Sequence, residues 1–404
     1  MTGNEDTIYD ELGVPSVVNA TGTKTRIGGT LIREEAREAM DRAAEAFVRL
    51  SDLQAVASER IAAVTGAEAG YVTNGASSAL ALAAAACIAG DDLETMARLP
   101  DTEGIPDEIV MPRTHRNGYD HALRLAGAEI VDVGANDYHL GTGSENTEPW
   151  EIAEAITEET VAIAYMEKPF TRPPLPEVVE IAHNHDVPVI VDAAAELPPT
   201  GNLRTFIEQG ADLVAFSGGK AIRGPQSSGI LAGRETFIRS VARQHLDMHA
   251  ESSVYEPPEA LVGADGLPGI PRQGIGRSMK VGKEELAGLL AALDAFIEED
   301  DDAVLSGWHE RAERIAAALE SVDTLEVELA NAAKTDAVST VVVTVGEDAS
   351  LTAAELVLAL RRENPRVFVG ADNVHRSWFT INPRCLSDSE VDYVAERIVD
   401  HLER

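Results

Sequence analysis

The fold is decided by residues Val187–Arg234, VPVIVDAAAELPPTGNLRTFIEQGADLVAFSGGKAIRGPQSSGILAGR. One apolar run ends at Asp192, a second ends at Ser217, and Lys220 follows in a glycine-rich turn. A third short apolar run covers Gly229–Gly233. Runs that are apolar throughout, rather than alternating, are typical of strands that helices cover on both faces of a sheet. The stretch therefore predicts buried neighbouring strands that place a carboxylate and a lysine at their ends.

Similar apolar runs precede this stretch and alternate with segments of helical periodicity. Their ranges are 70–74, 108–112, 128–134 and 161–166. Strand–helix alternation implies right-handed crossovers and a mostly parallel sheet, whose ligands sit beyond the carboxyl ends of the strands. The sequence thus predicts an α/β fold with two domains. The large one has a mostly parallel seven-stranded sheet covered by helices, and a smaller C-terminal α+β domain follows.

Changes of pattern divide the chain. Glycines at positions 22, 28 and 29 disfavour a regular helix in residues 12–33 and predict an irregular arm. A helix over 284–299 leads into the acidic run 298–302, after which helices and short strands alternate to the end. The expected division is an N-terminal arm over 1–33, a large domain over 34–283, and a linking helix with the small domain over 284–404.

The chain of 404 residues is strongly acidic, with 33 Lys and Arg against 69 Asp and Glu and a formal net charge of −36. Only six of the cations are lysines. An acidic, lysine-poor surface favours a halophilic protein, because concentrated salt screens the repulsion between its charges. An ordinary acidic cytosolic enzyme is the alternative. Nucleic acid is not an expected partner, since proteins that track phosphates need positive surfaces.

The sequence predicts neither a membrane protein nor a metal site. The first residues are acidic and lack the features of a signal peptide, and no apolar run approaches a membrane span. A cytoplasmic location is therefore expected. Cys87 and Cys385 lie far apart and in no metal-ligand spacing, so buried free thiols are expected.

Segments that carry cations but no acid stand out in so acidic a chain. Five such windows hold five of the six lysines. If the protein binds an anion, the windows are expected to converge on it, with arginines as forked donors for carboxylate or phosphate. The alternative is that they are simply buried, although buried segments rarely carry unpaired cations. The windows cover 12–33, 109–119, 168–176, 217–234 and 266–283.

The strand ends offer the groups that a pyridoxal phosphate enzyme requires, a lysine to bind the cofactor and a carboxylate to keep its ring nitrogen protonated. Lys220 and Asp192 are the natural pair, each just past a strand. His115, after the run 108–112, is the candidate to stack on the ring. Small and hydroxyl residues at the start of a helix suit the close approach of a phosphate to free N–H groups. The expected phosphate ligands are Gly75, Ala76, Ser77 and Ser217.

Each of these features has an ordinary alternative. A lysine in a glycine turn usually lies on the surface, Asp192 can cap a helix, and a histidine after a strand can hydrogen-bond a loop. The segment 75–90 can be a plain packing helix with a serine cap. Because every one of these groups follows a strand, the set as a whole favours the cofactor.

Six motifs carry a resemblance to a known family. They are VNATGT (18–23), YVTNGASSAL (71–80), HRNGYDHALRLAGAEIV (115–131), VIVDAAAELPP (189–199), AFSGGKAIRGPQSSGILAGR (215–234) and RQGIGRSMKVGKEEL (272–286). In their order along the chain and in their residues they resemble the aspartate aminotransferase-like, fold-type I pyridoxal phosphate enzymes. The resemblance is strongest to the selenocysteine-synthase-like branch, which includes seryl-tRNA selenium transferase and D-glucosaminate-6-phosphate ammonia-lyase.

The resemblance implies roles for particular residues. Lys220 would bind the cofactor covalently and then take the substrate Cα proton, and Asp192 would pair with the pyridine nitrogen. A lyase that removes a β-hydroxyl from an anionic amino acid or amino sugar acid is implied, assembled as a homodimer or higher homo-oligomer. The candidates for substrate contacts are Arg26, Arg223, Arg277, Lys280 and Arg376.

Two other functions stay open. An aminotransferase or a racemase starts from the same loss of the Cα proton. A non-catalytic protein that binds a sugar phosphate or nucleotide at the same glycine-rich crevice is an alternative of a different class. The turn around Lys220 is not a P-loop, because the spacing G-x-x-x-x-G-K-[ST] is absent.

Overall fold

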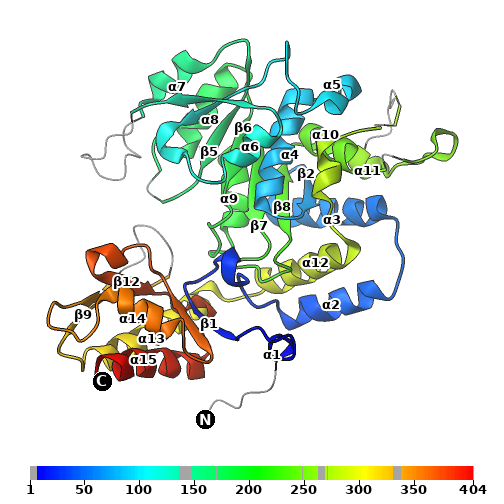
Figure 1. The fold of residues 1–404 in the computed structure, drawn as a ribbon. Coiled ribbons are helices and arrows are strands. Elements are labelled where there is room, and N and C mark those ends of the chain that lie inside the picture. The colour runs from blue at the N-terminus through cyan, green and yellow to red at the C-terminus, as the bar shows by residue number, and fades with distance from the viewer. Residues whose placement is uncertain are drawn as a thin grey trace. The chain divides into compact units, whose positions relative to one another are not determined.

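The structure, a computed structural model, describes residues 7–135, 147–169, 171–247, 249–262, 269–270, 272–330 and 338–403. The chain forms two compact units, Ile32–Glu298 and the segments Met1–Leu31 with Glu299–Arg404. The larger unit holds a seven-stranded sheet, and the smaller unit holds two short sheets (Figure 1). Across the described ranges, no helix combines the length and the apolar character needed to cross a bilayer.

Seven strands form the sheet of the larger unit, in the order β2-β8-β7-β6-β5-β3-β4. β8 runs antiparallel to both of its neighbours, and the other neighbouring pairs are parallel. The predicted mostly parallel, seven-stranded sheet is confirmed, and the carboxyl ends of β2 to β7 share one edge with the start of β8. The strands are β2 (Ala69–Thr73), β3 (Glu108–Pro112), β4 (Glu129–Val133), β5 (Thr160–Met166), β6 (Val189–Asp192), β7 (Leu213–Ser217) and β8 (Gly229–Gly233).

Helices cover both faces of this sheet (Figure 1). Alternate residues of a strand point to opposite faces, so Val189 and Val191 join one core cluster while Ile190 joins the other. Helix α4 (Ala76–Ala89) is buried along most of its length, because its many alanines let it lie close to the strands. The other helices around the sheet and its covering helices are α3 (Leu50–Thr65), α5 (Leu93–Arg98), α6 (His121–Leu125), α7 (Pro149–Ala155), α8 (Leu175–Asn184), α9 (Asn202–Glu208), α10 (Glu235–His245) and α11 (Glu259–Val262).

Two further helices of this unit, α2 (Glu34–Ala44) and α12 (Lys283–Ile297), pack on each other. Gly288 allows the approach, since a Cβ there would lie 2.6 Å from Met40 Cγ. Leu289, Leu293 and Phe296 of α12 are buried in the core of the unit. The predicted division groups the linking helix with the small domain, from residue 284 on. In the structure this helix is α12, and it packs within the larger unit, Ile32–Glu298.

The smaller unit has an antiparallel three-stranded sheet, in the order β12-β10-β9, and a parallel pair of β1 with β11. The predicted smaller α+β domain is confirmed as a fold. Its core gathers apolar residues from both sheets and from the helices beside them. The elements are α1 (Ile8–Glu11), β1 (Val17–Ala20), α13 (Asp301–Leu319), β9 (Leu325–Ala330), β10 (Thr340–Val345), α14 (Ala353–Leu360), β11 (Arg366–Val369), β12 (Trp378–Ile381) and α15 (Asp388–Leu402).

The prediction of an irregular arm over 12–33 is wrong for residues 17–20, which form β1. Burial alternates along this four-residue strand, with Val18 and Ala20 buried, but its letters VVNA do not alternate between apolar and polar residues, so the sequence shows no strand pattern there. Its strand structure comes from pairing with β11, a partner that lies far along the chain. Local sequence carries no sign of such a partner.

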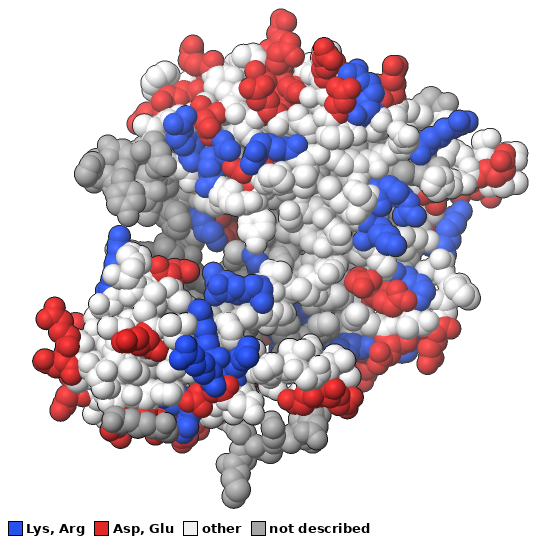
Figure 2. Space-filling view, in the orientation of Figure 1, with Lys and Arg blue, Asp and Glu red and all other residues white. Residues whose placement is uncertain are grey.

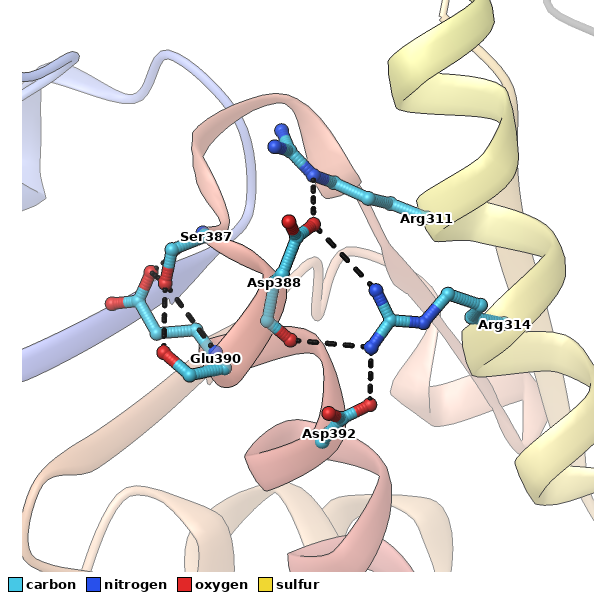
Figure 3. Close-up of polar contacts among 7 residues, drawn as sticks. Arg311, Arg314, Ser387, Asp388, Glu390 and Asp392 are labelled. Carbon is cyan, nitrogen blue, oxygen red and sulfur yellow. Dashed lines mark hydrogen bonds and ion pairs between the residues drawn. The ribbon is translucent and has the colours of Figure 1, made fainter. Parts of the chain in front are cut away.

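Helices α13 and α15 are joined by charged side chains (Figure 3). Arg311 Nε lies 3.0 Å from Asp388 Oδ1, and Arg314 Nη2 lies 2.6 Å from Asp392 Oδ1. Ser387 starts α15 with a capping box. Because Asp388 is 72% exposed, each ion pair contributes little to stability, and the apolar contacts beneath them hold the two helices together.

Candidate active site

The carboxyl edge of the larger sheet brings together two of the predicted site residues and the turn that carries a third. Asp192 ends β6 and is paired in register with Met166 on β5 and Ala215 on β7. Ser217 ends β7. Lys220 follows in the turn between β7 and β8. A carboxylate, a hydroxyl and a lysine thus follow neighbouring strands at one edge of the sheet.

Asp192 is a half-buried carboxylate with few partners. Its Oδ1 accepts the N–H of Ala194 at 3.1 Å, which is the single hydrogen bond of this side chain within the part of the chain that the structure describes. Burial raises the pKa of Asp192, while the Ala194 N–H, Lys220 and Lys168 lower it. An ionised carboxylate in such surroundings is stable beside a cation, so the position suits a protonated ring nitrogen.

Glycines shape the turn that carries Lys220. Gly218 donates its N–H to the carbonyl of Ser228 at 3.0 Å. A Cβ on Gly218 would lie 2.3 Å from Ser228 Oγ, and a Cβ on Gly219 would lie 2.8 Å from Gln226 Cα. No other residue fits such close approaches, which explains why two glycines precede the lysine.

The start of α4 forms an anion cradle. Its N-cap, Gly75, has a φ of 143°, and no side chain caps the helix. Ala76 and Ser77 supply first-turn N–H groups, which the helix dipole makes favourable to an anion. Gly229 packs so closely that a Cβ there would lie 2.4 Å from the carbonyl carbon of Gly75. Asn74 Oδ1 is buried here too, without a hydrogen bond to any described residue.

His115 lies in a 3-10 turn after β3, and its side chain is fully buried. Nδ1 accepts the N–H of Met166 at 3.3 Å, and the ring meets Tyr165 edge-on with the centroids 4.7 Å apart. Burial lowers the pKa of His115 to about 4, and the backbone of Arg172 raises it in part. The ring is therefore neutral and covered by protein, and its stacking on a cofactor stays a prediction.

A charged cluster that the sequence did not single out follows β5. Glu167 donates its backbone N–H to the Asp192 carbonyl at 3.0 Å. Lys168 Nζ lies 2.5 Å from Glu196 Oε1, and these two side chains are 24% and 10% exposed. Lys168 opens one of the acid-free windows, which is the signal available in the sequence, whereas Glu167 falls just outside that window.

Three acid-free windows lie at this edge of the sheet, since 109–119, 168–176 and 217–234 contain the segments that follow β3, β5 and β7. Uncharged residues make up most of the face in view, and both Asp and Glu and Lys and Arg gather in separate groups on it (Figure 2). The five predicted substrate ligands are exposed, and their role stays a prediction. They are Arg223, Arg277 and Lys280 in the larger unit, and Arg26 and Arg376 in the smaller unit.

The chain is similar to known enzymes over its whole length. A family model described as aminotransferase class-V matches residues 120–262. The D-glucosaminate-6-phosphate ammonia lyase of Salmonella typhimurium is 30% identical over 400 residues, covering 97% of this chain and 96% of that protein. The 5'-C-glycyluridine monooxygenase-decarboxylase of a Streptomyces species is 31% identical over 415 residues, covering 99% of this chain and 94% of that protein.

A solved structure of D-glucosaminate-6-phosphate ammonia-lyase has a TM-score of 0.79 to this chain at 29% identity, covering 99% of this chain and 100% of that one. The chain belongs to the fold-type I pyridoxal phosphate enzymes. The family resemblance of its motifs is confirmed, and so are pyridoxal phosphate as its cofactor and its assignment as a lyase-type enzyme.

The residues at the carboxyl edge fit this cofactor. Asp192 would pair with the ring nitrogen, Lys220 would bind the cofactor covalently, and Ser217 with the cradle at α4 would hold the phosphate. When bound, the cofactor supplies an electron sink for negative charge on the substrate Cα. The buried, unbonded Asn74 Oδ1 and the close approach of Gly229 mark the cradle as a place built for a ligand.

Proposed function

We propose that this enzyme is an ammonia-lyase that acts by α,β-elimination on an anionic amino sugar acid or a related 2-amino-3-hydroxy acid. The full-length similarity to D-glucosaminate-6-phosphate ammonia lyase carries the proposal. The cation-bearing windows at the edge of an otherwise acidic molecule support an anionic substrate.

Each residue at the edge has its own task in this reaction. Asp192 keeps the ring nitrogen protonated, a task that requires the ionised carboxylate, which the Ala194 N–H, Lys220 and Lys168 favour by lowering its pKa. Lys220 would hold the cofactor covalently, and it would also take the proton from the substrate Cα. Ser217 and the N–H groups of Ala76 and Ser77 hold the phosphate and so fix the plane of the ring. After the β-hydroxyl leaves, hydrolysis gives a 2-keto acid and ammonia.

The substrate contacts in this proposal come from exposed cations. Arg223 and Arg277 offer forked guanidinium groups, which match carboxylate and phosphate in geometry. Lys280 follows Arg277 closely and offers a further positive charge. Arg26 and Arg376 are the candidates from the smaller unit. The three-part division at residues 33 and 283 likewise stays a prediction.

The proposal extends to the setting in which the enzyme works. A net charge of −36 with six lysines supports a halophilic protein that binds no nucleic acid, and we propose the cytoplasm as its location. Phe47 is fully exposed and Val254 is 76% exposed on the larger unit, which supports contact with a second copy in a homo-oligomer. Sedimentation across a range of salt concentrations tests the homo-oligomer. Monomers at every salt concentration would contradict it.

Turnover tests the proposed reaction. The enzyme, loaded with pyridoxal phosphate, is incubated with D-glucosaminate 6-phosphate or serine, and ammonia and 2-keto acid are measured together. Equal amounts of both, without any added acceptor, are the expected result. A strict need for a keto-acid acceptor would instead identify an aminotransferase. Loss of optical activity without ammonia would identify a racemase.

A monooxygenase-decarboxylase is the second candidate, because the Streptomyces relative matches the chain over nearly its whole length at 31% identity. Such an enzyme consumes oxygen and releases the substrate carboxyl group as carbon dioxide. The same incubation in a sealed oxygen-electrode cell separates the two candidates. Ammonia release with no oxygen uptake supports the lyase, and coupled oxygen uptake with carbon dioxide release overturns it.

A further inference from the structure

One carboxyl group at the carboxyl edge has no task in the reaction described above. Met166, the last residue of β5, is the register partner of Asp192. Glu167 comes next and is tied to β6 by the bond from its N–H to the Asp192 carbonyl, 3.0 Å long. Glu167 therefore stands at the strand ends beside the predicted partner of the ring nitrogen.

The Glu167 side chain is half-buried, and it forms no hydrogen bond or ion pair with any residue that the structure describes. Lys168, the cation that lowers the pKa of Glu167, is engaged by Glu196 at 2.5 Å. A carboxylate withdrawn from water without a partner is costly, so the neutral acid is the form that this position favours. Burial and the charge of Glu196 raise the pKa of Glu167 to about 7, against a smaller lowering by Lys168.

The other titratable groups around this position are committed elsewhere. Glu196 is paired with Lys168, and Asp192 is the partner proposed for the ring nitrogen. His115 uses Nδ1 to accept the N–H of Met166 and stays neutral. Tyr165, whose hydroxyl donates to the Pro173 carbonyl at 2.9 Å, has its pKa raised by burial and by Glu167. Lys220 takes the Cα proton in the proposed reaction.

The proposed elimination needs a second proton-handling group. The Cα–H bond breaks and its electron pair forms the Cα–Cβ double bond, while the Cβ–O bond breaks and its pair leaves with oxygen. Hydroxide is a poor leaving group, so a proton must reach that oxygen as the bond breaks. We propose that Glu167 is the general acid that gives its carboxyl proton to the departing β-hydroxyl, which leaves as water. This inference rests on the ammonia-lyase function proposed above.

The test compares Glu167→Gln with Glu180→Gln, a control on the exposed face of α8. Infrared difference spectra of the cofactor-free proteins are expected to show a protonated carboxyl that titrates around pH 7 in the wild type and the control, and not in Glu167→Gln. With D-glucosaminate 6-phosphate in deuterated water, Glu167→Gln should keep its rate of Cα exchange within about threefold. Its ammonia release should fall about 10²- to 10⁴-fold, the usual loss for a missing general acid.

Equal losses of exchange and ammonia release in Glu167→Gln would overturn the inference, because they indicate a structural role. Unchanged ammonia release, or an infrared band that survives the substitution, overturns it as well. These results leave the proposed function intact, since wild-type enzyme still releases ammonia. Failure of the proposed function gives a different result. In that case the wild-type enzyme releases no ammonia from D-glucosaminate 6-phosphate or serine, and this result also overturns the inference about Glu167.

Discussion

Replacing Gly229 by alanine tests whether the start of β8 and the first turn of α4 form one preorganised phosphate cradle. The added Cβ would lie 2.4 Å from the carbonyl carbon of Gly75 and 2.6 Å from the nitrogen of Ala76. Both atoms belong to the backbone and cannot rotate away. The strand and the helix start must therefore separate by about 1 Å to reach ordinary van der Waals contact.

Two effects follow from this separation. Overpacking of this kind lowers the free energy of unfolding by about 1–3 kcal/mol. A displaced first turn also loses charge-assisted hydrogen bonds to the phosphate, each with a net value of about 1.5–3 kcal/mol, so the cofactor should bind about 10- to 100-fold more weakly. Urea unfolding of the cofactor-free protein measures the first effect, and titration with pyridoxal phosphate measures the second.

The matched control is Gly201→Ala, just before α9. A Cβ there meets no atom within 4 Å, and the backbone already has a helical φ of −55°. This variant should be neutral or gain up to about 1 kcal/mol in unfolding free energy. If Gly229→Ala binds the cofactor within threefold of the wild type and is as stable as Gly201→Ala, the cradle does not depend on the close approach of β8.

Two further predictions concern charge. Burial holds the pKa of both His115 and His245 at about 4, below the unfolded value of about 6.5. Their stabilising effect is complete above pH 6.5 and disappears as the pH falls toward 4, at about 1.4 kcal/mol per unit for each histidine. Urea unfolding from pH 7 to 4 measures this slope, which His245→Gln should reduce by about half and the exposed control His249→Gln should leave unchanged. Arg277→Met should lower kcat/KM by about 10- to 100-fold, measured with the proposed substrate, whereas an unchanged value removes Arg277 from the site.

The larger sheet could be predicted because burial on both faces makes its strands apolar throughout. The runs 108–112 and 229–233 coincide with β3 and β8. Helix α10 was missed for the opposite reason. Its buried residues include Ile238, Val241 and Ala242 at helical spacing, but Arg243, Gln244 and His245 are buried as well, so the apolar stripe is short and polar residues follow it directly.

The candidate site likewise contains residues that the sequence indicates and residues that it does not. Lys220 and Asp192 could be proposed from the sequence because each follows a strand whose end is visible as the end of an apolar run. Glu167 could not be recognised, because its properties come from burial and from Glu196 in the loop after a different strand. His115 is buried through its contacts with Tyr165 and Met166 of β5, and no local sequence pattern shows these contacts.

The central claim is that Lys220 binds pyridoxal phosphate. Lys168 is the rival lysine, since both lower the pKa of Asp192. Reduction of the loaded enzyme with borohydride, followed by peptide mass spectrometry, fixes the cofactor to the lysine that held it. The account predicts one reduced cofactor per chain on the peptide that contains Lys220, and none in Lys220→Ala. Label on Lys168, or no label on any lysine, would contradict it.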